Sequence, residues 1–266
     1  MDFRKYLDKT ARELDREVEK ILNQWLKEVE GIDRKLVPLA SAFIQSCQGG
    51  KRIRGVLVKL GYELTGKKSK EILKIGAAYE IFHSAILAHD DIIDQSETRR
   101  GKPSLYKKLG ISKAITLGDL GFFLAIRVIS ESNFPAEYKN QATRLFAKTI
   151  VDTAVGQLLD IEKGNPIITA KLKTAHYTIS GPLQLGAILA GMSPTSPRLR
   201  RVKEFGENLG IAFQIKDDIL DGQSNRLEEA KKYINSAKKM IPELTKDSKL
   251  SNLLEQMGGY LVDRKT

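Results

Sequence analysis

The residues best suited to chemistry in this sequence are two groups of aspartates, each spaced as D-D-x-x-D within an otherwise apolar stretch. Their members are Asp90, Asp91 and Asp94 in the first group and Asp217, Asp218 and Asp221 in the second. Aspartates four residues apart share one face of a helix, and a charge among apolar residues costs free energy unless an opposite charge compensates it. All six are therefore candidate metal ligands, and the two groups predict two walls of one metal–phosphate site.

Basic residues flank the first acidic group. Segment 49–54 combines two glycines with Lys51, Arg52 and Arg54, and an Arg-Arg pair occupies positions 99–100. A flexible backbone with several cations at the expected start of a helix suits the binding of an anion, although a turn with solvated charges would look the same. We therefore expect the site to hold phosphate groups through both metal ions and side chains.

Other kinds of site lack their motifs. The chain has no C-x-x-C pair or H-E-x-x-H for zinc, no P-loop, and no G-x-S-x-G elbow for a serine hydrolase. The net charge of +11 could attract nucleic acid, but the lysines are scattered among glutamates and aromatic residues are only 7%. Mg²⁺, which prefers oxygen ligands and substrate phosphates, is the metal that the aspartates predict.

The elements that must position these residues are all helices. Apolar residues recur at helical spacing, and Gly, Pro, Ser or Asn mark the breaks. The expected helices cover residues 5–29, 35–47, 56–64, 70–96, 111–131, 135–163, 168–191, 197–221, 226–243 and 246–264. His83 lies seven residues before Asp90 and shares its face. Residues 1–266 are thus expected to form a single all-α domain, an antiparallel helical bundle.

The composition places the chain in a reducing compartment. Cys47 is its single cysteine, so no internal disulfide can form. The charged start gives no sign of a secretory signal, and no apolar run reaches the roughly 18–20 residues that span a bilayer. We therefore expect a cytoplasmic protein without a transmembrane segment.

A series of motifs, in order over about residues 40–221, resembles one family. The motifs are Gly49-Gly50-Lys51-Arg52-x-Arg54, His83, Asp90-Asp91-x-x-Asp94, Ser96-x-x-Arg99-Arg100-Gly101-x-Pro103, Gly118-Asp119, Gly156-Gln157-x-x-Asp160, Lys173-Thr174, and Gly210-x-x-Phe213-Gln214-x-x-Asp217-Asp218-x-x-Asp221. The sequence resembles the trans-isoprenyl diphosphate synthases, which are head-to-tail prenyltransferases.

The resemblance implies a fold, a reaction and a role for each residue. The bundle would surround a deep central cavity, and a homodimer would bind isopentenyl diphosphate and an allylic diphosphate. Three Mg²⁺ ions would bridge Asp90, Asp94 and Asp217 to the allylic diphosphate. The family roles assign Arg99, Lys173, Thr174 and Gln214 to the allylic diphosphate, and Lys51, Arg54, His83 and Arg100 to isopentenyl diphosphate. Metal ions and fixed cations would stabilise the charge that develops on the leaving diphosphate, within a dry pocket.

The residues below the first acidic group are expected to limit product length. Ala85 and Ile86 lack the bulk that would stop a chain early. Phe82 lies two turns below Asp90, and Phe122 and Phe123 follow on the next helix, where the family can form the floor for a C20 product. Ordinary core packing would explain the same three phenylalanines. The resemblance favours C20 geranylgeranyl diphosphate, with farnesyl diphosphate or a somewhat longer product as the alternative.

The sequence departs from the family just after the second acidic group. A family loop and helix, which carry further lysines, are expected to be absent after residue 222. An open site would weaken water exclusion and charge neutralisation, so a non-catalytic or regulatory subunit of the same fold is one alternative. A class I terpene cyclase is another, although Lys51, Arg54 and Arg100 would give it an unneeded second diphosphate pocket.

Overall fold

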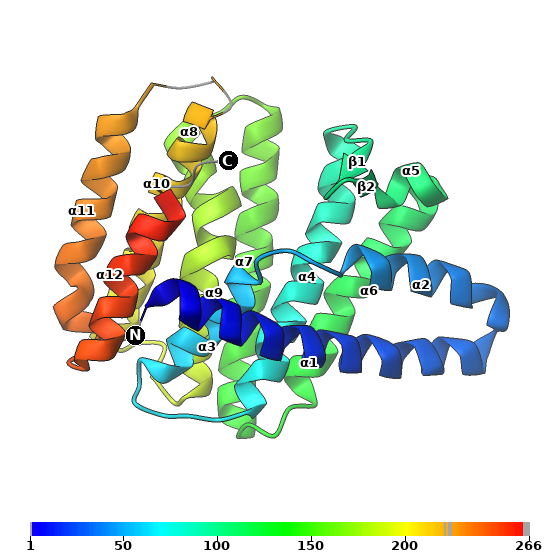
Figure 1. Ribbon diagram of the computed structural model, residues 1–266, viewed down its shortest axis with the longest axis horizontal. Coiled ribbons are helices and arrows are strands. Elements are labelled where there is room, and N and C mark those ends of the chain that lie inside the picture. Colours follow the sequence, from blue (N-terminus) through cyan, green and yellow to red (C-terminus); the bar gives the residue numbers. More distant parts are fainter. Residues whose placement is uncertain (1, 221, 223–224, 263–266) are drawn as a thin grey trace.

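The computed structural model describes residues 2–220, 222 and 225–262, and in this part of the chain nearly all regular structure is helical (Figure 1). The helices are α1 (Phe3–Ile32), η1 (Arg34–Leu36), α2 (Val37–Ser46), α3 (Ile53–Glu63), α4 (Glu71–Ile93), α5 (Leu105–Leu109), α6 (Ile111–Ser130), α7 (Ala136–Ile161), α8 (Pro166–Thr169), η2 (Ala170–Ser180), α9 (Gly181–Leu189), α10 (Pro197–Leu220), α11 (Leu227–Leu244) and α12 (Ser248–Val262). The expected all-α fold is confirmed.

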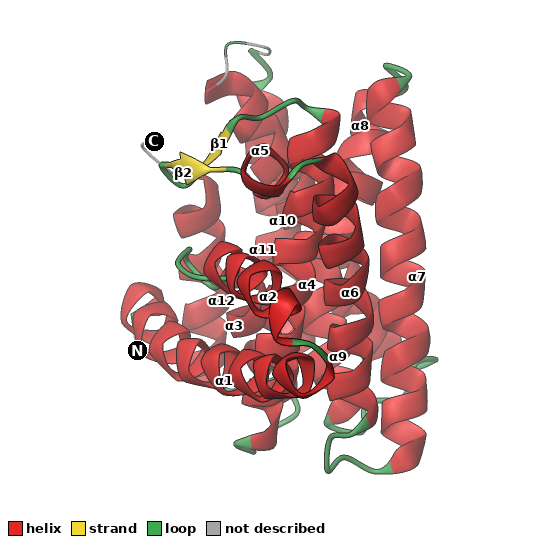
Figure 2. Ribbon diagram, turned by 90° about the vertical axis from the view of Figure 1, so that its right-hand side faces the viewer, coloured by secondary structure: helices red, strands yellow, loops and turns green. Residues whose placement is uncertain are grey.

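The long helices stand side by side, and α1 lies across them at one end (Figures 1 and 2). Helix α4 packs along α6, and α10 packs against both η2 and α11. Apolar side chains at intervals of three and four, such as Leu7, Leu14 and Val18 of α1, are buried between these layers. No helix in the described ranges is long and apolar enough to cross a membrane.

Several segments differ from the sequence-based expectation, and one of them is the short helix α5, which no expected range covers. The stretch expected as one helix over 168–191 divides into α8, the π-helix η2 and α9. The loop after the first acidic group contains a two-stranded hairpin of β1 (Thr98–Arg99) and β2 (Lys102–Pro103). Arg100 and Gly101 at its turn have φ values of 52° and 72°, a left-handed geometry that hydrophobic periodicity does not reveal.

Glycines allow η2 to lie unusually close to its neighbours. A Cβ atom added to Gly156 of α7 would lie 2.3 Å from the backbone nitrogen of Lys173. One added to Gly210 of α10 would lie 2.3 Å from the Cα atom of Ala175. Both distances are far below van der Waals contact, so only glycine permits these approaches. The two glycines therefore set where η2 presents its side chains.

Candidate active site

The first acidic wall stands at the carboxyl end of α4, where Asp90 lies in the last turn and Asp94 directly follows the helix. Partial burial raises the pKa of Asp90, and the negative charge of Asp94 raises it further. Two carboxylates that repel each other in a partly buried place are stabilised by a cation between them. The Asp90–Asp94 pair therefore suits a divalent metal ion.

Asp91 takes a different role from its two neighbours in the motif. The residue is only 3% exposed, and its carboxylate accepts hydrogen bonds from both Nε and Nη2 of Arg99. The physical reason is its position about 100° around the helix from Asp90, which turns it away from the Asp90–Asp94 face. The structure thus separates Asp91 from the other candidate ligands, and Asp91 orients Arg99, whose Nη2 lies 3.9 Å from Asp90.

A second group of polar residues comes together between α3, α4 and η2. Arg54 Nη1 lies 3.2 Å from Nε2 of His83, and Tyr177 OH lies 2.5 Å from the imidazole Nδ1. Because arginine can only donate, Nε2 of His83 accepts and its Nδ1 carries the proton. Burial holds the pKa of His83 well below its usual range, and the charge of Arg54 lowers it further. The imidazole is therefore neutral at physiological pH.

Arg54 retains hydrogen-bonding capacity at this site. Its guanidinium also donates to Thr178 Oγ1 at 2.9 Å and lies 4.3 Å above the ring of Tyr177. Its Nε atom is buried and finds no partner in the described part of the chain. A buried donor without a partner costs free energy, so it points to an acceptor such as a phosphate oxygen that the bound state supplies.

The remaining basic residues near this group divide by burial. Arg52 is 4% exposed and bonds to Asp15 at 2.7 Å and to the carbonyl of Cys47 at 2.9 Å, so it serves the fold rather than an anion site. Lys51 is exposed, and Arg100 Nη1 donates to the carbonyl of Gln48 at 2.6 Å. Burial lowers the pKa of Arg100, and the charge of the nearby Arg52 lowers it further.

The second acidic wall is part of a chain of hydrogen bonds. Thr174 Oγ1 donates to Gln214 Oε1 at 2.6 Å, and Gln214 Nε2 donates to Asp218 Oδ1 at 2.8 Å. Arg226 also pairs with Asp218 at 3.6 Å, a contact that the sequence interpretation did not predict. Asp217 lies in the same turn and is half-buried, whereas Asp221 lies outside the described residues.

Helix η2 connects the two walls. Its Lys173 pairs with Asp160 of α7 at 2.5 Å, and the charge of Lys173 acts on Asp90 of the first wall, where it counters the rise in pKa. The adjacent Thr174 bonds toward the second wall. Among the residues that the structure describes, no three metal-ligating side chains gather closely enough to hold an ion alone. Both walls would therefore need substrate oxygens to complete a Mg²⁺ site.

The expected floor residues do not all lie together. Phe82 is fully buried, its ring 5.6 Å from that of Phe122, and Ile86 packs against the same core. Ala85 is buried where α4 meets α6. The two helices lie so close there that a Cβ atom added to Gly121 of α6 would be 2.8 Å from the Cβ atom of Ala85. Phe123 is 71% exposed, since it follows Phe122 by 100° around α6, and so does not share the floor position within one chain.

Tyr177 is the residue of this site that sequence reasoning missed. It lies three residues after Thr174, and this closeness in sequence to the Lys173-Thr174 motif was the available signal. Its ring packs near Phe82 with centroids 6.2 Å apart, while its hydroxyl bonds to His83. Burial raises its pKa to about 12, so it remains a neutral phenol.

An ion cluster on the other side of η2 fixes its position. His176 Nδ1 lies 3.0 Å from Asp152 of α7, and its Nε2 lies 2.7 Å from Glu207 of α10. The ring therefore bridges a carboxylate of α7 and a carboxylate of α10. Burial alone would raise the pKa of Glu207, but the hydrogen bonds from His176 and Lys171 outweigh it and lower that pKa to about 2. This clamp holds η2 between α7 and α10.

The chain is similar to several known proteins. The polyprenyl synthetase family model matches residues 37–240. A geranylgeranyl diphosphate synthase of Sulfolobus acidocaldarius is 31% identical over 234 residues, which is 82% of this chain and 70% of that protein. A farnesyl diphosphate synthase of Geobacillus stearothermophilus is 31% identical over 77% of this chain and 71% of its own length.

Solved structures share the fold. A geranylgeranyl pyrophosphate synthase from Corynebacterium glutamicum, complexed with isoprenyl diphosphate and magnesium, superimposes with a TM-score of 0.87 at 21% identity. The match covers 97% of this chain and 99% of that structure.

The clamp on η2 leads to a test of stability. In His176→Leu, Asp152 and Glu207 would both lose the polar ring that lies between them, so we expect the free energy of unfolding to fall by about 2 kcal/mol. Lys148→Ala removes an exposed partner of the same Asp152 and should cost less than about 0.5 kcal/mol. Urea unfolding at pH 7 measures both, and equal costs would contradict the clamp.

Proposed function

The chain belongs to the polyprenyl synthetase family, and we propose that it is a Mg²⁺-dependent prenyltransferase that joins isopentenyl diphosphate to an allylic diphosphate. The observation that carries this proposal is the Asp90–Asp94 pair, with its raised Asp90 pKa, beside a separate cationic group around Arg54. The Asp90–Asp94 pair suits a metal-bound phosphate, and the cationic group around Arg54 suits a phosphate held by side chains alone.

Metal binding is proposed for the residues that fit it. Asp90 and Asp94 on one wall and Asp217 on the other would hold three Mg²⁺ ions together with the allylic diphosphate. When bound, the ions stabilise the charge that develops on the leaving diphosphate. Lys173, held by Asp160 at 2.5 Å, would add a fixed positive charge, and Arg99 would do the same because Asp91 orients it.

The second substrate is proposed to bind beside Arg54. Lys51 and Arg100 lie around the Gln48–Gly50 loop, and the orphan Nε of Arg54 would donate to the diphosphate of isopentenyl diphosphate. Neutral His83 would orient Arg54 without repelling it. A terpene cyclase uses one diphosphate, so this separate cationic group supports the two-substrate reaction instead.

We propose that the longer family loop after the second acidic wall is absent from this chain. Helix α10 ends at Leu220 and α11 begins at Leu227, which supports the absence of the longer family loop. Residues 221, 223 and 224 lie outside the described residues. We also propose a cytoplasmic location, supported by the single, buried Cys47.

We expect Asp90→Ala to abolish turnover while the fold survives, because the metal-binding pair would be broken. The assay combines the full chain, Mg²⁺, labelled isopentenyl diphosphate and farnesyl diphosphate, and the rate should fall about a thousandfold. Asp8→Ala removes an exposed aspartate of α1 and should leave the rate unchanged. Absence of any extended product from the wild-type chain would refute the enzyme and favour the non-catalytic subunit.

A C20 product is proposed from the aromatic residues below Asp90. Phe82 and Phe122 would close the pocket, so Phe122→Ala should lengthen the product by one or more C5 units. Phe123→Ala removes the neighbouring but exposed ring and should leave the product distribution unchanged. Chromatography of the dephosphorylated products measures both, and an unchanged length in Phe122→Ala would exclude this floor.

A homodimer is proposed from exposed apolar residues on the adjacent helices α6 and α7. Phe123 is 71% exposed, and Leu158 and Val155 are 62% and 44% exposed. Large exposed apolar side chains on neighbouring helices are typical of an interface. Phe123→Glu should raise the dimer dissociation constant at least tenfold in analytical ultracentrifugation, whereas Ile32→Glu, at the 78% exposed end of α1, should not. A monomeric wild-type chain would overturn the proposal.

A further inference from the structure

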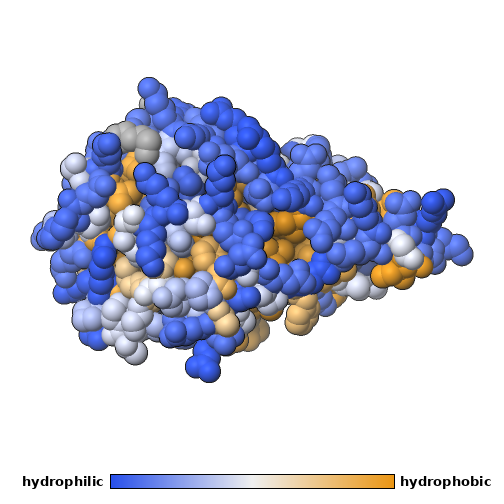
Figure 3. Space-filling view, turned by 90° about the horizontal axis from the view of Figure 1, so that it is seen from below, coloured by the Kyte–Doolittle hydropathy of each residue, from blue (hydrophilic) through white to orange (hydrophobic). Residues whose placement is uncertain are grey.

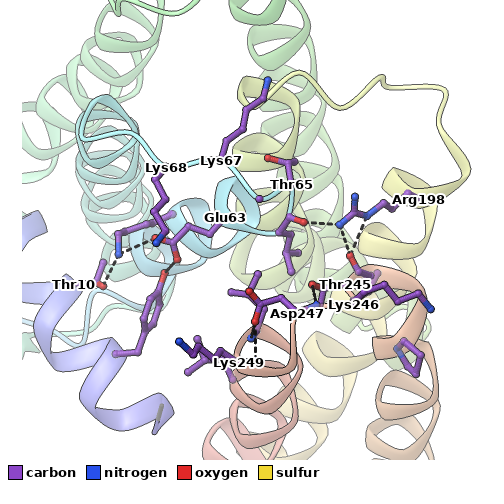
Figure 4. Close-up of a pocket in the computed structure, with 18 of the residues that line it drawn as sticks. Thr10, Glu63, Thr65, Lys67, Lys68, Arg198, Thr245, Lys246, Asp247 and Lys249 are labelled. Atoms are coloured by element: carbon purple, nitrogen blue, oxygen red, sulfur yellow. Dashed lines mark hydrogen bonds and ion pairs between the residues drawn. The ribbon is translucent and has the colours of Figure 1, made fainter.

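A pocket of about 1040 Å³ lies at the end of the bundle opposite the acidic walls. Its walls come from the start of α1, the end of α3 with the following loop, and the connection between α11 and α12 (Figure 4). Arg198, in the first turn of α10, lines this pocket, whereas Asp217 lies nineteen residues later on the same helix. At 1.5 Å per residue the pocket lies roughly 28 Å from the second wall, and so it is separate from the candidate active site.

The pocket carries a large excess of positive charge. Seven lysines and Arg198 line it, against three acidic residues, Glu63, Glu243 and Asp247. Each acid is already engaged. Glu63 pairs with Lys59 at 3.2 Å and accepts from Tyr6 OH at 2.7 Å. Glu243 pairs with Arg201, outside the pocket, at 2.7 Å, and Asp247 accepts from the first backbone amides of α12.

The other lysines therefore lack acidic partners. Within the described part of the chain no ion pair involves the remaining six, which are Lys5, Lys9, Lys67, Lys68, Lys246 and Lys249. They converge from segments far apart in the sequence, and Figure 4 shows Lys67 and Lys68 on a different wall from Lys246 and Lys249. A concave surface lined by one sign of charge concentrates its field on an incoming ion of the opposite sign.

Arg198 keeps two of the walls together. It donates from Nε to the carbonyl of Leu244 at 3.0 Å and reaches the carbonyl of Leu64 through Nη2. These carbonyls lie at the carboxyl ends of α11 and α3, where the helix dipole favours a positive charge. The lysines thus stand on a framework that does not depend on a ligand. From this end, numerous hydrophilic side chains cover the molecule between apolar areas (Figure 3).

The lining also restricts the chemistry of a ligand. Its one aromatic residue, Tyr6, is 5% exposed, and Lys59 covers the ring at 4.7 Å from its centroid. No base could stack there. None of the lining residues is an exposed large apolar side chain of the kind that anchors an acyl chain. Most of the exposed side chains that line the pocket are lysines, so closely spaced anionic groups match it best.

We propose that this pocket is a second anion site, which binds a small molecule carrying two or more phosphate groups. The lysines at its rim hold the phosphates through charge-assisted hydrogen bonds, and bound anions replace the acidic partners that these lysines lack. Because the lysines are exposed, binding is weakened by salt. The site is independent of the proposed prenyl transfer.

The test uses the full chain and labelled inorganic triphosphate in equilibrium dialysis, with Mg²⁺ chelated. The variant Lys67→Gln, Lys68→Gln, Lys246→Gln should weaken one class of bound triphosphate about tenfold, because several weak charge pairs are lost together. The matched control Lys27→Gln, Lys35→Gln, Lys232→Gln makes the same change of charge at exposed lysines outside the pocket. This control should change the affinity for triphosphate less than twofold. Triphosphate bound by cations at the active site contributes equally to the measurements on both variants.

Three results would overturn the proposal. Equal weakening in the two triple variants would show diffuse charge rather than a site, and unchanged binding in the pocket variant would place the triphosphate elsewhere. The third result comes from flotation of the protein with vesicles that contain phosphatidylglycerol. If the chain binds these vesicles through the pocket lysines but does not bind triphosphate, the pocket belongs to a membrane-binding surface. Prenyl transfer by the pocket variant should equal wild type, so the outcome does not depend on the proposed enzyme activity. A thermal unfolding curve confirms that both variants are folded.

Discussion

The structure depends on holding negative charge in a partly buried place without neutralising it completely. Asp91 is satisfied by Arg99, which leaves Asp90 and Asp94 as neighbours that repel each other. A fully paired cluster would be more stable but could not bind a metal ion and a phosphate. The proposed metal ion would relieve this unfavourable interaction, and groups with perturbed pKa values are typical of functional sites.

Helix η2 makes this arrangement possible because it connects both walls and the cationic group. Within five residues it supplies Lys173 near Asp90, Thr174 toward Gln214, and Tyr177 to His83. A π-helix has wider turns than an α-helix and often marks functional segments. Its position is set by close glycine contacts with Lys173 and Ala175 and by the ionic clamp around His176.

Much of the fold and of the site could be predicted from residue spacing. Helical periodicity located the long helices, and the family motifs correctly indicated the family that the comparisons show. Spacing also had limits, because a motif does not distinguish its members. Asp91 and Arg52 look like ligands in sequence, yet each is buried with a structural partner, and Phe123 looks like Phe122 but faces outward.

By itself the sequence determined the helical architecture, the family and the residue types gathered at the site, since these follow from local periodicity and from the order of motifs. Only the tertiary structure decided how each charge is compensated. Contacts between separate segments of the chain decide whether His83 is neutral, whether Arg99 is held in place, and whether the lysines of the distant pocket lack partners. Electrostatic energies depend on burial and distance, and residue order specifies neither.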